Sequence, residues 1–78
     1  MLQKKLCLVV TFDATAAAMA AEKYCREKGV PGRLIPVPRE ITAGCGLAWK
    51  AEVGQEEAVT AALQEAGIAY SGVHRVVI

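Results

Sequence analysis

The chain has 78 residues, of which 54% are apolar and 5% aromatic, and nine Lys and Arg against eight Asp and Glu give a formal net charge of +1. This size predicts one small α/β sandwich domain spanning residues 1–78. Because phosphate-binding faces usually show as a basic excess, the near-neutral charge argues against nucleic acid and against a membrane surface as partners.

The three cysteines, Cys7, Cys25 and Cys45, are widely spaced and include no Cys-x-x-Cys pair. That pattern fits neither a disulfide framework nor a zinc site, so we expect no metal site and no cofactor. The first apolar run, residues 6–10, is too short for a signal peptide or a membrane span. These features predict a reduced, cytoplasmic protein.

The first third of the chain predicts a strand followed by a helix. Residues 6–12 form a continuous apolar run with branched side chains, which is typical of a strand buried on both faces. We expect Asp13 to cap a helix over residues 14–28, and Gly29 to end it. The apolar stripe of this helix, at i, i+3, i+4, i+7 spacing, consists of Ala14, Ala17, Ala18, Ala21 and Cys25.

The middle of the chain predicts two strands joined by a loop rich in small residues. The strand at residues 32–37 is expected at a sheet edge, because Pro36 and Pro38 have no backbone N–H to donate to a neighbouring strand. Residues 47–53 alternate between apolar and polar side chains, which predicts a half-buried strand.

The last third predicts a second helix and a final strand. Glu56 and Glu57 suit the first turn of a helix, where the helix dipole favours negative charge, and Gly67 suits its end. Residues 68–70 and 73–78 are expected to be extended. The apolar stripe of the second helix consists of Ala58, Val59, Ala62, Leu63 and Ala66.

The resulting order, β-α-β-β-α-β, favours an α+β fold of the ferredoxin-like kind, with two helices on one face of a four-stranded antiparallel sheet. The other face would carry Lys50 and Glu52 and lie open to water or to a partner. A different small α/β sandwich with another strand order is the alternative. An edge strand also leaves room for a homodimer.

One loop carries residues that suit chemistry at a thiol. Cys45 lies between Gly44 and Gly46, after a turn stiffened by Pro36 and Pro38. Glycine neighbours leave the sulfur sterically open and allow positive φ, so that successive N–H groups can converge on an anion.

Arg39, six residues before Cys45, is the obvious cation of the same loop. It would favour the thiolate, which is the nucleophile and the form that accepts sulfur as a persulfide. The opposing interpretation makes Cys45 a small buried hydrophobe and Arg39 a partner in a surface ion pair. Cys7 and Cys25 are expected in the core, and no acid or His is placed to form a catalytic pair with a cysteine.

The runs at residues 36–41 and 43–48, Pro-Val-Pro-Arg-Glu-Ile and Ala-Gly-Cys-Gly-Leu-Ala, resemble the signature of the selenium/sulfur carrier protein-like family. The start of the chain is similar to that family too, with a strand ending near Phe12 and Ala-Glu-Lys at residues 21–23 of the helix. The resemblance spans nearly the whole chain. The Cys-Pro-x-Pro motif of the better-studied sulfur-relay proteins is absent.

The resemblance implies a non-enzymatic carrier, in which Cys45 holds sulfur or selenium as a persulfide or selenopersulfide. Arg39 would steady the anion, and Gly44 and Gly46 would shape the N–H groups around it. Such a carrier needs two partners, a persulfide or selenium donor protein such as a cysteine desulfurase and an acceptor enzyme.

Two other functions remain open from the sequence. A binding or regulatory module would use the loop at residues 39–46 to hold the carboxylate or phosphate of a small ligand. A redox enzyme or sensor would need Cys7 or Cys25 to approach Cys45 in the fold. We rank the carrier first, the binding module second and the redox protein third.

Overall fold

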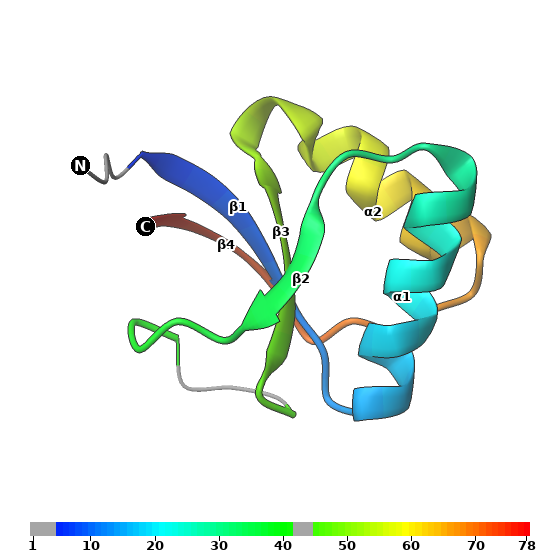
Figure 1. Ribbon diagram of the computed structural model, residues 1–78, viewed down its shortest axis with the longest axis horizontal. Helices are drawn as coiled ribbons and strands as arrows, with labels where there is room; N and C mark the ends of the chain where they lie inside the picture. The colour runs from blue at the N-terminus through cyan, green and yellow to red at the C-terminus, as the bar shows by residue number, and fades with distance from the viewer. Residues whose placement is uncertain (1–4, 42–44) are drawn as a thin grey trace.

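The computed structural model describes residues 5–41 and 45–78, which form a four-stranded antiparallel sheet with two α-helices on one face (Figure 1). The strands are β1 (Leu6–Thr11), β2 (Arg33–Pro36), β3 (Leu47–Glu52) and β4 (Gly72–Val77). The helices are α1 (Thr15–Lys28) and α2 (Glu56–Glu65), and a 3-10 turn, η1 (Val53–Gln55), precedes α2. The strand order β2-β3-β1-β4 confirms the predicted ferredoxin-like α+β fold.

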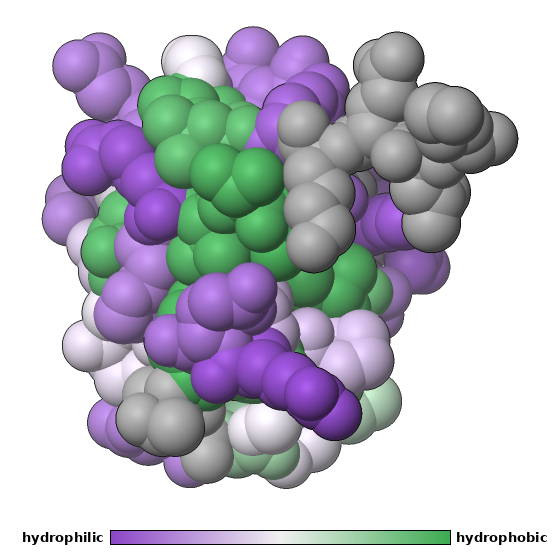
Figure 2. Space-filling view, turned by 90° about the vertical axis from the view of Figure 1, so that its left-hand side faces the viewer, coloured by the Kyte–Doolittle hydropathy of each residue, from purple (hydrophilic) through white to green (hydrophobic). Residues whose placement is uncertain are grey.

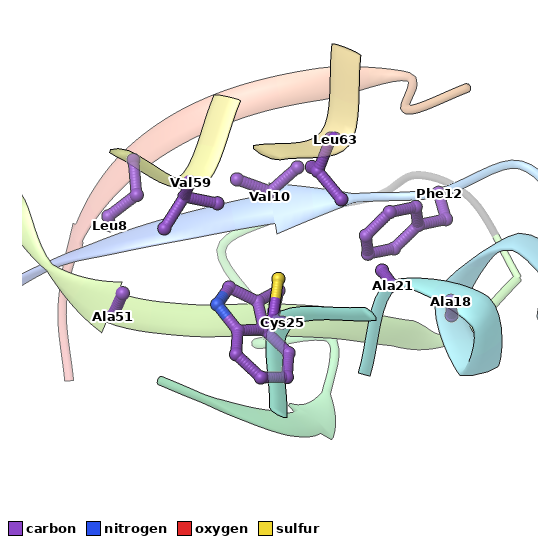
Figure 3. Close-up of a cluster of buried hydrophobic side chains, with 10 residues drawn as sticks. Leu8, Val10, Phe12, Ala18, Ala21, Cys25, Ala51, Val59 and Leu63 are labelled. Atoms are coloured by element: carbon purple, nitrogen blue, oxygen red, sulfur yellow. The ribbon is translucent and has the colours of Figure 1, made fainter. Parts of the chain in front are cut away.

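β1 is central because it pairs with both β3 and β4, and it is buried from Cys7 to Thr11, as the continuous apolar run predicted. Alternate side chains of β1 point toward the helices, and small alanines on α1 allow that helix to lie close to the sheet. Figure 3 shows side chains of both helices directed at β1 and β3. This helix-side core consists of Leu8, Val10, Phe12, Ala18, Ala21, Cys25, Trp49, Ala51, Val59 and Leu63.

The two ends of α1 differ in how well they were predicted. Gly29 ends the helix as expected, with φ +73°, a conformation that glycine adopts without steric cost. The expectation that Asp13 caps the helix is wrong, because Ala14 is the N-cap and no side chain accepts from the first turn. Phe12 is buried in the helix-side core, and the Ala14 carbonyl, one residue further on than expected, accepts the first helical N–H groups.

β2 is an edge strand, in agreement with its prolines. One glycine, Gly32, allows the chain to pass from α1 into this strand. The Trp49 indole N–H donates to the Pro31 carbonyl at 3.2 Å, and the ring lies directly against Gly32. Gly32 has φ +130°, and a Cβ atom there would lie 2.4 Å from Trp49 Nε1 and 2.6 Å from the Lys50 carbonyl oxygen. Gly32 is therefore required both by its conformation and by the close approach of Trp49.

The expectation that residues 68–70 belong to the last strand is wrong, since β4 begins at Gly72. The Ile68 N–H donates to the Leu63 carbonyl at 2.9 Å, so this residue closes the end of α2 and does not join the sheet. The apolar stripe of α2 is also narrower than expected, because Ala58 is exposed. The buried residues of that helix are Val59, Ala62 and Leu63.

The sheet face away from the helices is less polar than expected. Lys50 and Glu52 lie on it, but Val9, Ala48 and Ile41 form a second buried cluster there. Ile41 comes from the β2–β3 connection and covers part of the face, which the strand pattern alone did not predict. Figure 2 shows hydrophobic surface in the middle of this face with hydrophilic side chains around it. The hydrophobic side chains packed against this open-face cluster are Ile35, Val37, Val76 and Ile78.

Candidate functional site

The carboxyl end of β1 gathers segments that are far apart in the sequence. β3 and β4 run antiparallel to β1 on either side of it, so their first residues lie beside its last ones. Thr11 pairs with Ala48 of β3 and with Gly72 of β4, and α1 begins four residues later at Thr15. The loops before β3 and β4 and the first turn of α1 therefore meet at one end of the sheet (Figure 1).

Cys45 lies at this end. Its backbone N–H donates to the Phe12 carbonyl at 2.8 Å, and its half-buried side chain packs against the helix-side core. Its Sγ atom is 4.0 Å from the Leu47 carbonyl oxygen, a weak thiol hydrogen bond. The sulfur thus lies on the helix side of the sheet.

The other two cysteines are fully buried. Cys7 is 1% exposed and Cys25 is 0% exposed, in β1 and on the apolar stripe of α1 as predicted. Burial raises the pKa of the Cys25 thiol, because the charged thiolate loses its hydration there. All three thiols are free, and Cys45 is the one whose side chain is partly accessible to a reactant.

The N-terminus of α1 is the electrostatic feature of this end of the sheet. Its first turn contains no acidic residue and has no side-chain cap, so its free N–H groups keep their partial positive charge. Phe12, which accepts from Cys45, is only three residues before Thr15. The start of α1 is therefore only a few residues along the chain from the carbonyl that holds Cys45, and the exposed Asp13 lies between the two. Sequence reasoning missed this feature, although the acid-free start of the helix was visible.

Arg39 lies in a tight turn on another part of the molecule's surface. The Ile41 N–H donates to the Pro38 carbonyl at 3.0 Å, which leaves Arg39 and Glu40 exposed at the tip. Figure 1 shows this turn, in green, on the side away from the helices and apart from the start of β3. Within residues 5–41 and 45–78, no hydrogen bond or ion pair joins Arg39 to Cys45 or to a carboxylate. Its action on the Cys45 thiolate stays a prediction.

Of the two glycines beside Cys45, the structure describes Gly46. Gly46 has φ +93°, and its carbonyl accepts from the Val37 N–H at 2.9 Å, which closes the loop. The N–H of Cys45 is occupied by Phe12 and is not free to hold an anion. Gly44 lies outside the described residues.

The prolines hold the first end of the loop. Pro36 is the last residue of β2 and pairs with Leu47, and Pro38 starts the tight turn. The loop thus leaves the sheet and returns to it at neighbouring positions.

A polar cluster lies at the same end of the sheet. The buried Thr11 hydroxyl is 2.9 Å from that of Ser71, whose N–H donates to the Thr11 carbonyl at 2.8 Å. The His74 ring folds over Gly72, where a Cβ atom would lie 2.8 Å from His74 Nε2 and 3.3 Å from Thr11 Oγ1. Alternation along β1 puts Thr11 on the face opposite Phe12, so this cluster faces away from Cys45. Only the pairing of β1 with β4 brings it together.

The part of the chain that the structure describes contains no group of three or more His, Cys, Asp or Glu side chains placed to hold a metal ion. Its helices are also too short or too polar to cross a membrane.

Together these features define a small ferredoxin-like α+β protein that presents one half-exposed thiol near the start of a helix. A family model described as "Putative Se/S carrier protein-like" matches residues 7–75. The chain therefore belongs to this family, as the motifs around Cys45 predicted. No curated protein and no solved structure matches it.

Proposed function

We propose that the protein carries a sulfur or selenium atom on the thiol of Cys45 and acts as a carrier, not as an enzyme. The observation that carries this proposal is the exposure of Cys45 in a chain whose other two cysteines are buried. Membership of the Se/S carrier-like family supports the nature of the cargo.

Loading is a transfer of a zero-valent sulfur atom between thiols. The Cys45 thiolate attacks the terminal sulfur of a persulfide on a donor protein, such as a cysteine desulfurase. A new S–S bond forms at Cys45 while the donor's S–S bond breaks, and the electron pair leaves with the donor thiolate. The step consumes no oxidant or reductant. Selenium follows the same course with an S–Se bond in place of the S–S bond.

Unloading reverses the roles. A nucleophile on the acceptor enzyme attacks the terminal sulfur or selenium atom, and Cys45 leaves as the thiolate. Both steps need an anionic sulfur at Cys45, because the thiolate is the nucleophile and the leaving group. We assign Arg39 a supporting role toward the same anion, which its exposed position allows when a partner is docked.

Half-burial of Cys45 suits a cargo that must be protected from solvent between partners. Its side chain is packed on one side against the helix-side core, so a donor has to approach the end of the sheet from outside. The donor and acceptor are thus expected to dock at the same end of the molecule in turn.

The test is intact-mass analysis after incubation with a cysteine desulfurase and cysteine, without reductant. The wild-type protein is expected to gain the mass of one sulfur atom, and the Cys45→Ser variant none. Cys25→Ala is the matched control, because it removes a buried thiol and should load like wild type. Loading of Cys45→Ser at the wild-type rate would overturn the assignment, and so would a wild-type protein that accepts sulfur from no donor.

A further inference from the structure

The sheet face away from the helices carries a cluster of positive side chains at the end farthest from Cys45. Lys5, Arg33 and Lys50 line one hollow of about 290 Å³, together with Cys7 and Glu52. Leu47, where β3 begins, and Lys50 are three residues apart, which along a strand is about 10 Å, and Cys45 lies before Leu47 with its side chain on the helix side. The hollow is therefore separate from the carrier site.

The pairing of the strands brings these cations together. Arg33 of β2 is directly opposite Lys50 of β3, and directly opposite residues point to the same face. Lys50 is in turn opposite Val9 of the open-face cluster. Alternation along the chain from Val9 through Cys7 puts Lys5 on this face too.

Two like charges directly opposite each other on a sheet repel, which destabilises the pair unless an anion lies between them. Within residues 5–41 and 45–78, neither Arg33 nor Lys50 forms an ion pair, and the ion pairs found there lie elsewhere, at Arg26–Glu22 and Arg75–Glu56. Glu52 is the one carboxylate that lines the hollow in the described part of the chain, and it too forms no ion pair there.

We propose that this cationic hollow, lined by Lys5, Arg33 and Lys50, binds a small divalent oxyanion of the phosphate or sulfate class. Its lining side chains carry three positive charges and one negative charge, a net charge of +2 that matches a dianion. A water molecule occupies about 30 Å³ in the liquid, so the hollow holds a tetrahedral oxyanion with bound water. The Arg33 guanidinium offers paired N–H donors to two oxygens, and the lysines add point charges.

The test is titration of the ¹⁵N-labelled wild-type protein with inorganic phosphate at constant ionic strength, followed by NMR. We expect shifts of the amides around Cys7, Arg33 and Lys50 that saturate with phosphate. Arg33→Gln is expected to weaken binding about tenfold, since it removes a charge-assisted hydrogen-bonding partner. Glu52→Gln is expected to strengthen binding, because it removes the opposing charge.

The matched control is Lys23→Gln, which removes an exposed positive charge from α1 and should leave phosphate binding unchanged. Phenyl phosphate, titrated in parallel, distinguishes a phosphate ester from the free ion. Saturable binding of either compound at the hollow supports the proposal. Shifts scattered over all basic residues, an equal loss in Lys23→Gln, or binding only of an acidic polypeptide would overturn it. The Cys45→Ser variant should bind phosphate normally, so this proposal and the carrier function fail independently.

Discussion

The substitution Gly32→Ala tests how the structure joins β2 to the rest of the sheet. The added Cβ atom would lie 2.4 Å from Trp49 Nε1 and 2.6 Å from the Lys50 carbonyl oxygen. The second contact is with backbone of the neighbouring strand, so rotation of a side chain cannot relieve it. We expect the chain to separate β2 from β3 locally or to displace Trp49 from the core.

The expected loss of stability is a sum of three effects. A non-glycine residue at φ +130° costs of order 1–3 kcal/mol. Loss of the hydrogen bond from Trp49 to Pro31 costs about 1 kcal/mol, and overpacking of the strand pair costs about 1–3 kcal/mol more. A loss of about 3–7 kcal/mol is large beside the roughly 4–12 kcal/mol expected for the free energy of unfolding of a chain of this length.

The assay is urea unfolding followed by circular dichroism, with Gly29→Ala as the matched control. Gly29 also has a positive φ, +73°, but nothing lies within 4 Å of its Cβ position, so we expect a loss of about 1–2 kcal/mol. With an m-value of about 1 kcal/mol/M, the midpoint of Gly32→Ala should fall at least about 1 M below that of the control. Equal midpoints would refute the reasoning from the close approach of Trp49. If Gly32→Ala does not fold, the double variant Gly32→Ala with Trp49→Phe should regain part of the stability, because a phenyl ring is smaller than an indole ring.

Two further predictions concern the thiols and the loop. Because burial raises the pKa of Cys25, the unfolded chain loses that proton first as the pH rises. The free energy of unfolding should therefore decline from about pH 8.5 upward, where a free thiol ionises. Urea midpoints measured across this range should decline less in Cys25→Ala, and an undiminished decline would contradict the prediction. Arg39→Ala should slow the transfer of sulfur from the desulfurase to Cys45 severalfold, with Lys28→Ala as the control, because we assign Arg39 its role when a partner is docked. An unchanged rate would show that Arg39 does not act at the Cys45 site. If Arg39→Ala instead loses binding of a carboxylate or phosphate ligand while Cys45 still reacts normally, the binding module is favoured.

Local features of the sequence were sufficient for most of the fold. The alternation in β3, the glycine at the end of α1 and the edge position of β2 each follow from the conformational limits of one residue or one short repeat. Errors arose where the tertiary structure overrode a local preference, since Asp is by itself the better N-cap residue. The N-cap of α1 moved from Asp13 to Ala14 in this way.

The sequence by itself determined the family, the order of the elements and which cysteines belong to the core, because these depend on short motifs and on periodicity. The tertiary structure alone decided what surrounds Cys45. Its N–H is bound by Phe12, it lies near the start of α1, and Arg39 is placed on a separate turn. The cationic hollow formed by Lys5, Arg33 and Lys50 was likewise invisible in a chain of near-zero net charge. Contacts between distant segments depend on strand order and register, which no local pattern contains.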